Sequence, residues 1–391
     1  MPAQTLYASL IGIDAYPQNA LNGCIKDVLD VDLLLRELSA QQENVLYQPA
    51  YFLAPNATDK VRIADYSKDY KIDIDAQLPT FDIFTKDVFA HLKKAKDSDI
   101  CLLYYSGHGS HTEAPEEFWH TKPDRQNETI VSLDSRDPRQ SGSRDIIDKE
   151  LAFLLYDALN GKDVHCLVIM DCCHSGNNTR AMLSVEENDL RFRHIPSAKN
   201  KISLAKYIGF DRGFYKIENG RASIDIARYV HLAAARSAEK AQETSTGGLF
   251  TNKLIENLRA GGTSRSYSEL IQSLSITVSS RASRQNPVAY ARESKDLDLI
   301  FLGGGIKPFQ PSYEVRFNHS NKKWVMYGGA MHNIVASGND AKTQVKITGI
   351  DRTVNVLIVE AITSILDIKE EELDTGTVSY THLTLPTILR V

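Results

Sequence analysis

The sequence VHCLVIMDCCHSG at residues 164–176 joins an apolar run to an acidic, thiol-rich turn. The run 164–170 is typical of a fully buried strand in a parallel sheet. A second run, DICLLYY at residues 99–105, ends in a similar turn, Ser106-Gly107-His108-Gly109. Catalytic groups gather at the carboxyl ends of strands in open α/β sheets. If the two runs are neighbouring parallel strands, Cys173 and His108 emerge at the same edge as a thiol and an imidazole base.

The composition is that of a globular protein and does not indicate nucleic-acid or membrane binding. The chain has 391 residues, 42% hydrophobic and 24% charged, enough for one large domain and a smaller one. A net charge of -5, with no sustained Lys/Arg block, argues against a nucleic-acid partner. There is no apolar run of about 18 residues and no signal-peptide pattern. The five cysteines are typical of reduced thiols, so we expect a cytoplasmic protein.

Strands and helices are expected to alternate over the first 300 residues. Apolar runs predict strands, and apolar residues at helical spacing predict helices. The expected strands cover residues 6–13, 47–53, 99–105, 164–170, 229–235 and a last region at 288–290 with 299–302. The expected helices cover residues 28–38, 82–96, 146–159, 250–258 and 267–279. This alternation predicts an α/β fold, a mostly parallel sheet with helices on both faces.

The remaining segments have weaker patterns. Residues 111–144 are rich in charge, proline and glycine, which predicts a surface excursion rather than core. Residues 177–228 are polar and basic, and we interpret them as a mobile linker with local structure. Glycines at 303–305 predict a hinge, and alternating runs beyond it predict a small β-rich module over 304–377. Residues 378–391 resemble a translated sequencing-adaptor tail, so we expect them to be non-native.

A thiol next to an imidazole is typical of a cysteine hydrolase. Such an enzyme needs a thiolate, a base and hydrogen-bond donors for the developing oxyanion. Free cysteine titrates near about 8.5 and histidine near about 6.5, so an adjacent imidazole can accept the thiol proton. The alternative is that Cys172 and Cys173 are core thiols and His108 is a loop histidine. Two separate motifs, each at a strand end, favour the catalytic interpretation.

Three motifs resemble those of the caspase-like cysteine peptidases, most closely the metacaspases. They are LNGCIKD at 21–27, YSGHG at 105–109 and DCCHSG at 171–176. The resemblance covers about residues 6–302 and implies a caspase-like α/β/α peptidase domain over residues 1–303. Within it we expect a large-subunit-like part (1–176), the linker (177–228) and a small-subunit-like part (229–303).

The resemblance also implies a role for each site residue. Cys173, rather than Cys172, would be the nucleophile and His108 the base. The backbone N–H groups of Gly109 and Cys173 would form the oxyanion hole. His174 would orient or line the site.

The charge of the first specificity pocket predicts the substrate. The resemblance puts Asp27, Ser106 and Asp171 in this pocket, whereas the pocket of animal caspases is basic and takes aspartate. Two partly desolvated carboxylates favour arginine or lysine. We therefore predict protein or peptide substrates with Arg or Lys before the scissile bond. The alternatives are that Asp27 is a helix N-terminal charge and Asp171 a turn residue.

Many metacaspases bind calcium, and here the resemblance weakens. Asp134 and Asp148 are the candidates for two of the ligands. Lys149 and Arg180 stand where further carboxylates are expected, and hard cations prefer oxygen ligands. We therefore predict calcium-independent activity that needs no cofactor.

The segment after the cysteine motif is where the family cleaves itself. Its basic residues are candidate processing sites, unless they form only a solvated basic loop: Arg180, Arg191, Arg193, Lys199 and Lys201.

The leading hypothesis is a cysteine endopeptidase with a Cys-His dyad, monomeric like the metacaspases. A caspase-like signalling or scaffold protein without turnover is the first alternative, although the intact Cys173, His108 and acidic pocket argue against it. A ligase that works through the same thioester is the second. The C-terminal module resembles accessory domains of bacterial caspase-like proteins, which suggests partner recruitment. The stretch around Trp324 fits a small barrel's core better than a recognition surface.

Overall fold

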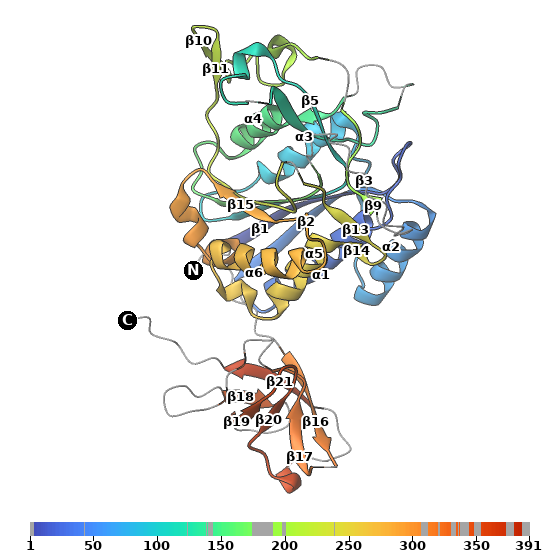
Figure 1. Cartoon of the computed structure of the whole chain (residues 1–391), viewed down its shortest axis with the longest axis vertical. Coiled ribbons are helices and arrows are strands. Elements are labelled where there is room, and N and C mark those ends of the chain that lie inside the picture. Colours follow the sequence, from blue (N-terminus) through green and yellow to red (C-terminus); the bar gives the residue numbers. More distant parts are fainter. Residues whose placement is uncertain are drawn as a thin grey trace. The chain divides into compact units, whose positions relative to one another are not determined.

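The computed structural model describes most of the chain as two compact units (Figure 1). The described residues are 4–42, 44–122, 124–137, 139, 144–173, 191–197, 201–237, 239–305, 312–319, 321–329, 334, 336, 344–347, 353–372 and 379–384. The first unit consists of Met1–Ile255 with Arg265–Lys307, and the second of Glu256–Ser264 with Pro308–Val391.

A seven-stranded sheet forms the centre of the first unit (Figure 1). In spatial order its strands are β15 (Val288–Ala291), β12 (Val230–Ala233), β8 (His165–Asp171), β4 (Ile100–Ser106), β1 (Gln4–Ile13), β2 (Val45–Ala54) and β3 (Ala76–Gln77). All neighbours pair in parallel except β15, which runs antiparallel to β12. The predicted mostly parallel α/β sheet is therefore confirmed.

Helices cover both faces of this sheet. They are α1 (Cys24–Ala40), α2 (Ala57–Tyr70), α3 (Phe81–Leu92), α4 (Asp148–Leu159), α5 (Leu249–Arg259) and α6 (Tyr267–Ser279). Figure 1 shows α3 and α4 on one side of the sheet and α1, α5 and α6 on the other. Helix α1 begins where the two carboxylate oxygens of Asp14 accept the N–H groups of Cys24 and Ile25, both at 3.0 Å. These bonds satisfy donors that a helix start leaves unpaired.

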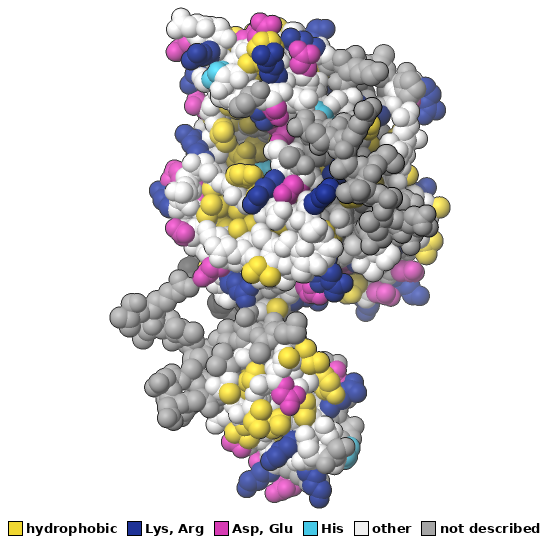
Figure 2. Space-filling view, viewed as in Figure 1, with side chains coloured by type: hydrophobic (Ala, Val, Ile, Leu, Met, Phe, Trp, Pro, Cys, Tyr) yellow, Lys and Arg dark blue, Asp and Glu magenta, His cyan; other side chains and the backbone are white. Residues whose placement is uncertain are grey.

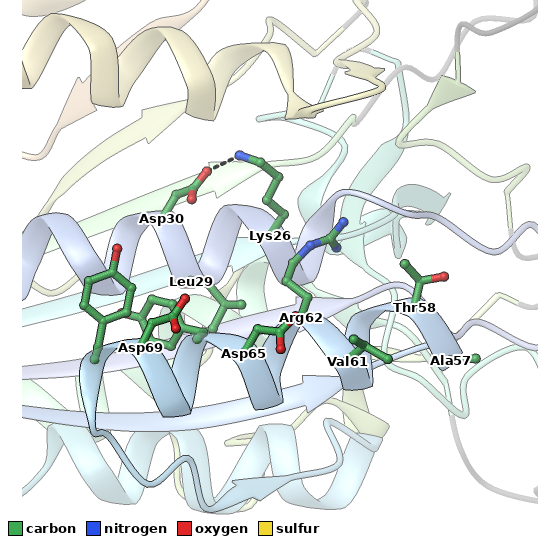
Figure 3. Close-up of a pocket in the computed structure, with 11 residues that line it drawn as sticks. Lys26, Leu29, Asp30, Ala57, Thr58, Val61, Arg62, Asp65 and Asp69 are labelled. Carbon is green, nitrogen blue, oxygen red and sulfur yellow. Dashed lines mark hydrogen bonds and ion pairs between the residues drawn. The ribbon is translucent and has the colours of Figure 1, made fainter.

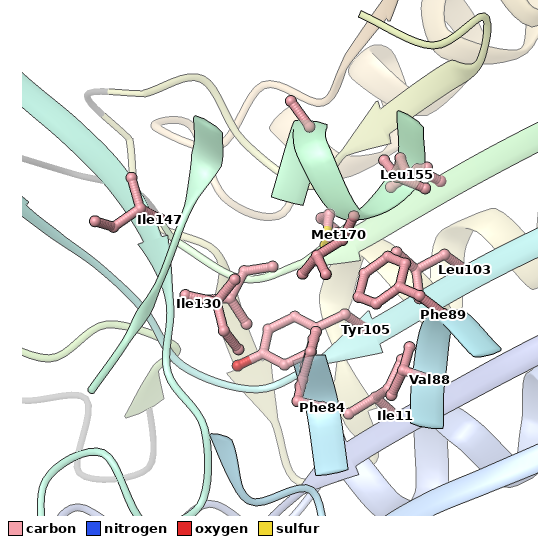
Figure 4. Close-up of a cluster of buried hydrophobic side chains, with 14 of the residues drawn as sticks. Ile11, Phe84, Val88, Phe89, Leu103, Tyr105, Ile130, Ile147, Leu155 and Met170 are labelled. Carbon is pink, nitrogen blue, oxygen red and sulfur yellow. The ribbon is translucent and has the colours of Figure 1, made fainter. Parts of the chain in front are cut away.

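The main hydrophobic core lies between the sheet and helices α3 and α4 (Figure 4). Phe84, Val88 and Phe89 of α3 meet strand residues such as Leu103 and Met170 there. This packing fixes the carboxyl ends of β4 and β8, where the two sequence motifs begin.

Two segments that were expected to lie outside the core contribute to it. Within and beside 111–144, strands β5 (Gly109–Glu113), β6 (Gln126–Ile130) and β7 (Ile146–Ile147) form an antiparallel sheet. Phe118 and Ile130 are buried, so the predicted surface excursion was wrong. The described residues 201–228 include the hairpin of β10 (Lys216–Glu218) and β11 (Arg221–Ser223). They also bury Leu204 and Tyr215, so this part is no linker.

Two further differences concern single elements. Helix α2 occupies a stretch that the sequence left unassigned, because only Asp59 and Tyr66 of this helix are buried and no apolar stripe marks it. The expected strand at 299–302 was wrong, since the chain there forms a 3-10 turn, Phe301–Gly304.

The second unit contains a closed barrel, which confirms the predicted β-rich module. Its strand order is β16 (Ser312–Asn318), β17 (Lys323–Met326), β20 (Ser364–Leu366), β19 (Thr353–Val359), β18 (Gln344–Ile347) and β21 (Ser379–Thr384). Trp324 and Met326 are fully buried in the barrel, so Trp324 is a core residue. Strand β21 lies within the tail 378–391 and pairs with β16 and β18.

Among the helices that the structure describes, none has both the length and the apolar character needed to cross a bilayer. Figure 2 shows acidic and basic side chains interspersed over the described surface of one face.

Candidate active site

The two sequence motifs meet because β4 and β8 are adjacent parallel strands. Their register places Ser106 opposite Asp171 at the carboxyl ends. Two residues further on lie His108 and Cys173, which are 1% and 0% exposed. Gly109 separates the two turns, and a Cβ there would lie 1.9 Å from the carbonyl oxygen of Cys173. Only glycine therefore allows this close approach.

His108 is held as a neutral imidazole in one tautomer. Burial lowers its pKa to about 4, although the hydrogen bond to Asn19 opposes this shift. Its Nε2 lies 2.6 Å from the carbonyl oxygen of Asn19. A carbonyl only accepts, so Nε2 carries the hydrogen and Nδ1 keeps the lone pair that a base needs. The ring packs against that of Tyr16, with centroids 4.6 Å apart.

Cys173 is held as a neutral thiol. Burial raises its pKa to about 12, although the backbone of Ala241 opposes the shift. The N–H of Ala241 donates to Sγ at 2.7 Å, and the thiol lies 3.3 Å from the carbonyl oxygen of Ala241. Because desolvation is the main cause of both shifts, both side chains are uncharged in this buried arrangement. Entry of water would bring both pKa values back toward each other.

The two expected oxyanion donors converge on one oxygen atom, the carbonyl oxygen of Arg193. It accepts the N–H of Gly109 at 3.0 Å and that of Cys173 at 3.1 Å. These are the distances expected for an oxyanion hole. The carbonyl group of Arg193 therefore lies where a scissile carbonyl would be polarised.

The side chain of the same arginine fills the acidic pocket. Asp27, Ser106 and Asp171 are completely buried, and so is Arg193. Nη2 lies 2.6 Å from Asp27 and 3.6 Å from Glu243, and Nη1 lies 3.0 Å from Asp171 and 2.8 Å from Ser106 Oγ. Burial raises the pKa of Asp27 and the guanidinium of Arg193 opposes this shift. One guanidinium thus faces three carboxylates.

Neighbouring groups fix the two pocket carboxylates. The N–H of Gly248 donates to both oxygens of Asp27, at 3.0 and 3.1 Å. Thr251 donates to Asp171 Oδ2 through its hydroxyl at 2.7 Å and its N–H at 3.2 Å. Asp27 does lie in the first turn of α1, but its carboxylate faces the pocket, so it is not merely a helix-end charge. Sequence reasoning missed Glu243, Gly248 and Thr251. The run TGGLFT at 246–251 was the available signal for Gly248 and Thr251.

The segment 191–197 passes through the site in extended form. Strand β9 (Arg191–Phe192) pairs antiparallel with β13 (Gln242–Thr244), which in turn pairs with β14 (Gly247–Gly248). The N–H of Arg193 donates to the carbonyl of Ala241 at 3.2 Å. Beyond Arg193 the chain follows β5, where the N–H of Ile195 donates to the carbonyl of Gly109 at 3.2 Å. The segment therefore lies as a bound peptide would.

The candidate calcium residues have other partners. Asp134 accepts the N–H of Phe81 at 2.8 Å. Asp148 lies 2.7 Å from Nζ of Lys149 and 3.1 Å from Nζ of Lys122. Burial works against ionisation of Asp148, yet the two lysines hold its pKa below the usual range. Arg180 and His174 lie outside the described residues.

Two other features of the first unit resemble binding sites. Asp14, Cys24 and Glu243 offer ligand atoms within 4.8 Å of one another, but the oxygens of Asp14 already accept the helix N–H groups described above. A groove of about 750 Å³ lies between α1 and α2, lined by Leu29, Val61 and Asp65 among others (Figure 3). Among the described residues that line this groove there is neither cysteine nor histidine.

Comparisons with known proteins agree on one family. A family model described as "Caspase domain" matches residues 5–298. "Metacaspase-2" of Trypanosoma brucei brucei is 24% identical over 313 residues, 77% of this chain and 77% of that protein. "Metacaspase-1" of Mycosarcoma maydis is 31% identical over 172 residues, 43% of this chain and 35% of that protein.

Two solved structures are similar at low identity. One is a protein of Geobacter sulfurreducens, with a TM-score of 0.48 and 18% identity, covering 76% of this chain and 98% of that one. The other is Caspase-1 of Spodoptera frugiperda, with a TM-score of 0.34 and 10% identity, covering 74% and 87%.

Proposed function

Because this chain belongs to the caspase-domain family and is a cysteine-type peptidase acting on proteins, we propose that it cleaves after arginine or lysine with Cys173 and His108 as its catalytic pair. The proposal rests on the position of Arg193 in the site. Its guanidinium fills the acidic pocket while its carbonyl oxygen accepts both oxyanion donors. Side chain and scissile group are thus presented together, as in a bound substrate.

The proposed reaction is acyl transfer through a thioester. His108 takes the proton of the Cys173 thiol, and the sulfur attacks the carbonyl carbon to form a C–S bond. The N–H groups of Gly109 and Cys173 stabilise the oxyanion, each worth about 10²- to 10³-fold in rate. The C–N bond breaks, and the amine leaves with the proton from His108. Water, deprotonated by His108, then hydrolyses the thioester and restores the thiol.

Arginine should be preferred over lysine. The guanidinium of Arg193 bridges Asp27 and Asp171 with separate nitrogens, 2.6 and 3.0 Å from their oxygens. The shorter, single-headed ammonium of lysine cannot reproduce this two-pronged contact, although its charge still matches the pocket.

We further propose that the chain processes itself between Arg193 and His194. Of the five candidate processing sites, Arg180 and Lys199 lie outside the described residues. Lys201 is paired with Glu113 at 3.0 Å, on a partly exposed surface. The geometry of Arg193 supports cleavage after this residue.

No cofactor is part of the proposed reaction, and we propose that calcium is not required. Two lysine ammonium groups pair with Asp148, where the family's calcium ligands are expected. We also propose that the enzyme is monomeric and cytoplasmic, and that its C-terminal barrel recruits partners. The five cysteines, all free thiols, are compatible with that location.

Hydrolysis of two matched fluorogenic peptides tests the proposal, one with Arg and one with Asp before the scissile bond. We expect turnover of the Arg peptide, at least about 100-fold faster than that of the Asp peptide, because an acidic side chain would meet buried carboxylates. The rate should be equal in calcium and in chelator. A folded protein that cleaves neither peptide would contradict the proposal and favour a scaffold role, and loss of activity in chelator would overturn calcium independence.

A further inference from the structure

The residues that follow Arg193 make their own contacts with the enzyme. From these contacts we propose that the peptidase selects its substrates on the leaving-group side as well. It would prefer an aromatic or imidazole side chain directly after the cleaved arginine and a branched aliphatic side chain next. This inference rests on the proposed function and extends it from one residue of the substrate to three.

Strand β5 provides the main-chain framework for these residues. His194 forms a parallel bridge with Gly109, and the N–H of Ile195 donates to the carbonyl of Gly109 at 3.2 Å. Ser110 Oγ lies 3.0 Å from the carbonyl oxygen of Ile195 and 3.1 Å from that of Pro196. Bonds to the backbone do not depend on side chains, so they would hold any extended substrate in the same register.

The first subsite is the ring of His111. It is 6% exposed, and it stacks on the ring of His194 with centroids 5.9 Å apart and an interplanar angle of 10°. An aromatic or imidazole side chain can stack on this flat, buried ring and so gain binding free energy. A small polar side chain gains little there.

The second subsite is apolar. Ile195 is 5% exposed and belongs to the main hydrophobic core cluster, whereas the next residue, Pro196, is exposed. A branched aliphatic side chain would therefore gain binding energy at the second position but no longer at the third.

The side chain of Ser110, which contacts the segment's backbone, is itself held by Arg136. Nη2 of Arg136 donates to Ser110 Oγ at 3.1 Å and to Asp145 at 2.6 Å. The hydroxyl that meets the substrate backbone is thus held in place by a charged pair, so the geometry does not depend on the bound segment alone.

The test uses internally quenched peptides with the sequence LRFRHIPS, residues 190–197. Three variants each carry one serine, in place of the histidine, the isoleucine or the proline. We expect kcat/KM to fall about 10- to 100-fold for the isoleucine variant and about two- to tenfold for the histidine variant. The proline variant is the matched control and should change less than about twofold. Competition from the enzyme's own cleaved segment lowers all four rates alike, so the ratios are unaffected.

A variant of the enzyme at His111 tests whether this residue forms the first subsite. In His111→Ala the ratio between the histidine and serine peptides should fall toward one. Thr112→Ala, the next residue of β5, points to the opposite face of the strand and should leave that ratio unchanged. Equal rates for all four peptides would overturn the inference while leaving cleavage after arginine intact. Failure to cleave any of them would overturn the proposed function, and this inference with it.

Discussion

Replacing Cys173 by alanine is expected to lower the hydrolysis of an arginine peptide by about 10⁴-fold or more. The Cys173 sulfur is the only protein atom proposed to form a bond with the substrate carbon. The backbone N–H of residue 173 would remain to polarise the carbonyl. The same variant should stay uncut on incubation. Rates of peptide hydrolysis and the size of the chain on a denaturing gel measure both effects.

Cys172→Ala is the matched control for that variant. Cys172 is the adjacent thiol and is equally buried, at 2% exposed. Removing it should cost about 1 kcal/mol of stability and leave the rate within a few-fold of the wild type. If instead Cys172→Ala were inactive and Cys173→Ala active, the assignment of the nucleophile would be wrong.

The second large effect is expected from Asp27→Asn, which keeps the shape of the side chain and removes its charge. In this variant kcat/KM for an arginine peptide should fall about 10²- to 10³-fold, because the buried guanidinium loses a charged partner. A peptide with citrulline, the uncharged analogue of arginine, should lose much less. The measured quantity is the ratio of kcat/KM for the two peptides, which should shrink at least about tenfold.

Asp32→Asn controls for a general effect of changing a buried acid in α1. Asp32 is also completely buried and pairs with Arg36 at 2.8 Å. Its loss should lower stability but leave the arginine-to-citrulline ratio unchanged. An unchanged ratio in Asp27→Asn would show that the pocket is not where the substrate arginine binds.

The fold could be predicted where the signals are local. The runs that became β4 and β8 are continuous and apolar, and each ends in its motif. The central sheet, and the position of His108 and Cys173 at the same edge of it, therefore follow from the pattern alone. Helix α2 was not predicted because it buries little of its surface, and only Asp59 and Tyr66 of this helix are buried. The sheet of β5 to β7 was not predicted because its strands are short and are separated by charged, proline-containing loops.

The position of Arg193 could not be read from the sequence. Arg191 and Arg193 are two residues apart in a basic stretch, and local pattern does not distinguish them. The choice is made by the pairing of β9 with β13, in which Arg191 lies opposite Glu243 and the N–H of Arg193 reaches Ala241. These partners are about 50 residues further along the chain, so only the tertiary structure specifies which arginine enters the pocket.

The mass of the fragments released by the purified chain tests the central claim most directly. We expect one N-terminal fragment that ends at Arg193 and a second fragment that begins at His194. Arg193→Ala should abolish this cut, whereas Arg191→Ala should retain it. A first cut after any other residue, or a chain that cleaves arginine peptides but never itself, would contradict the claim that segment 191–197 lies in the site as a substrate.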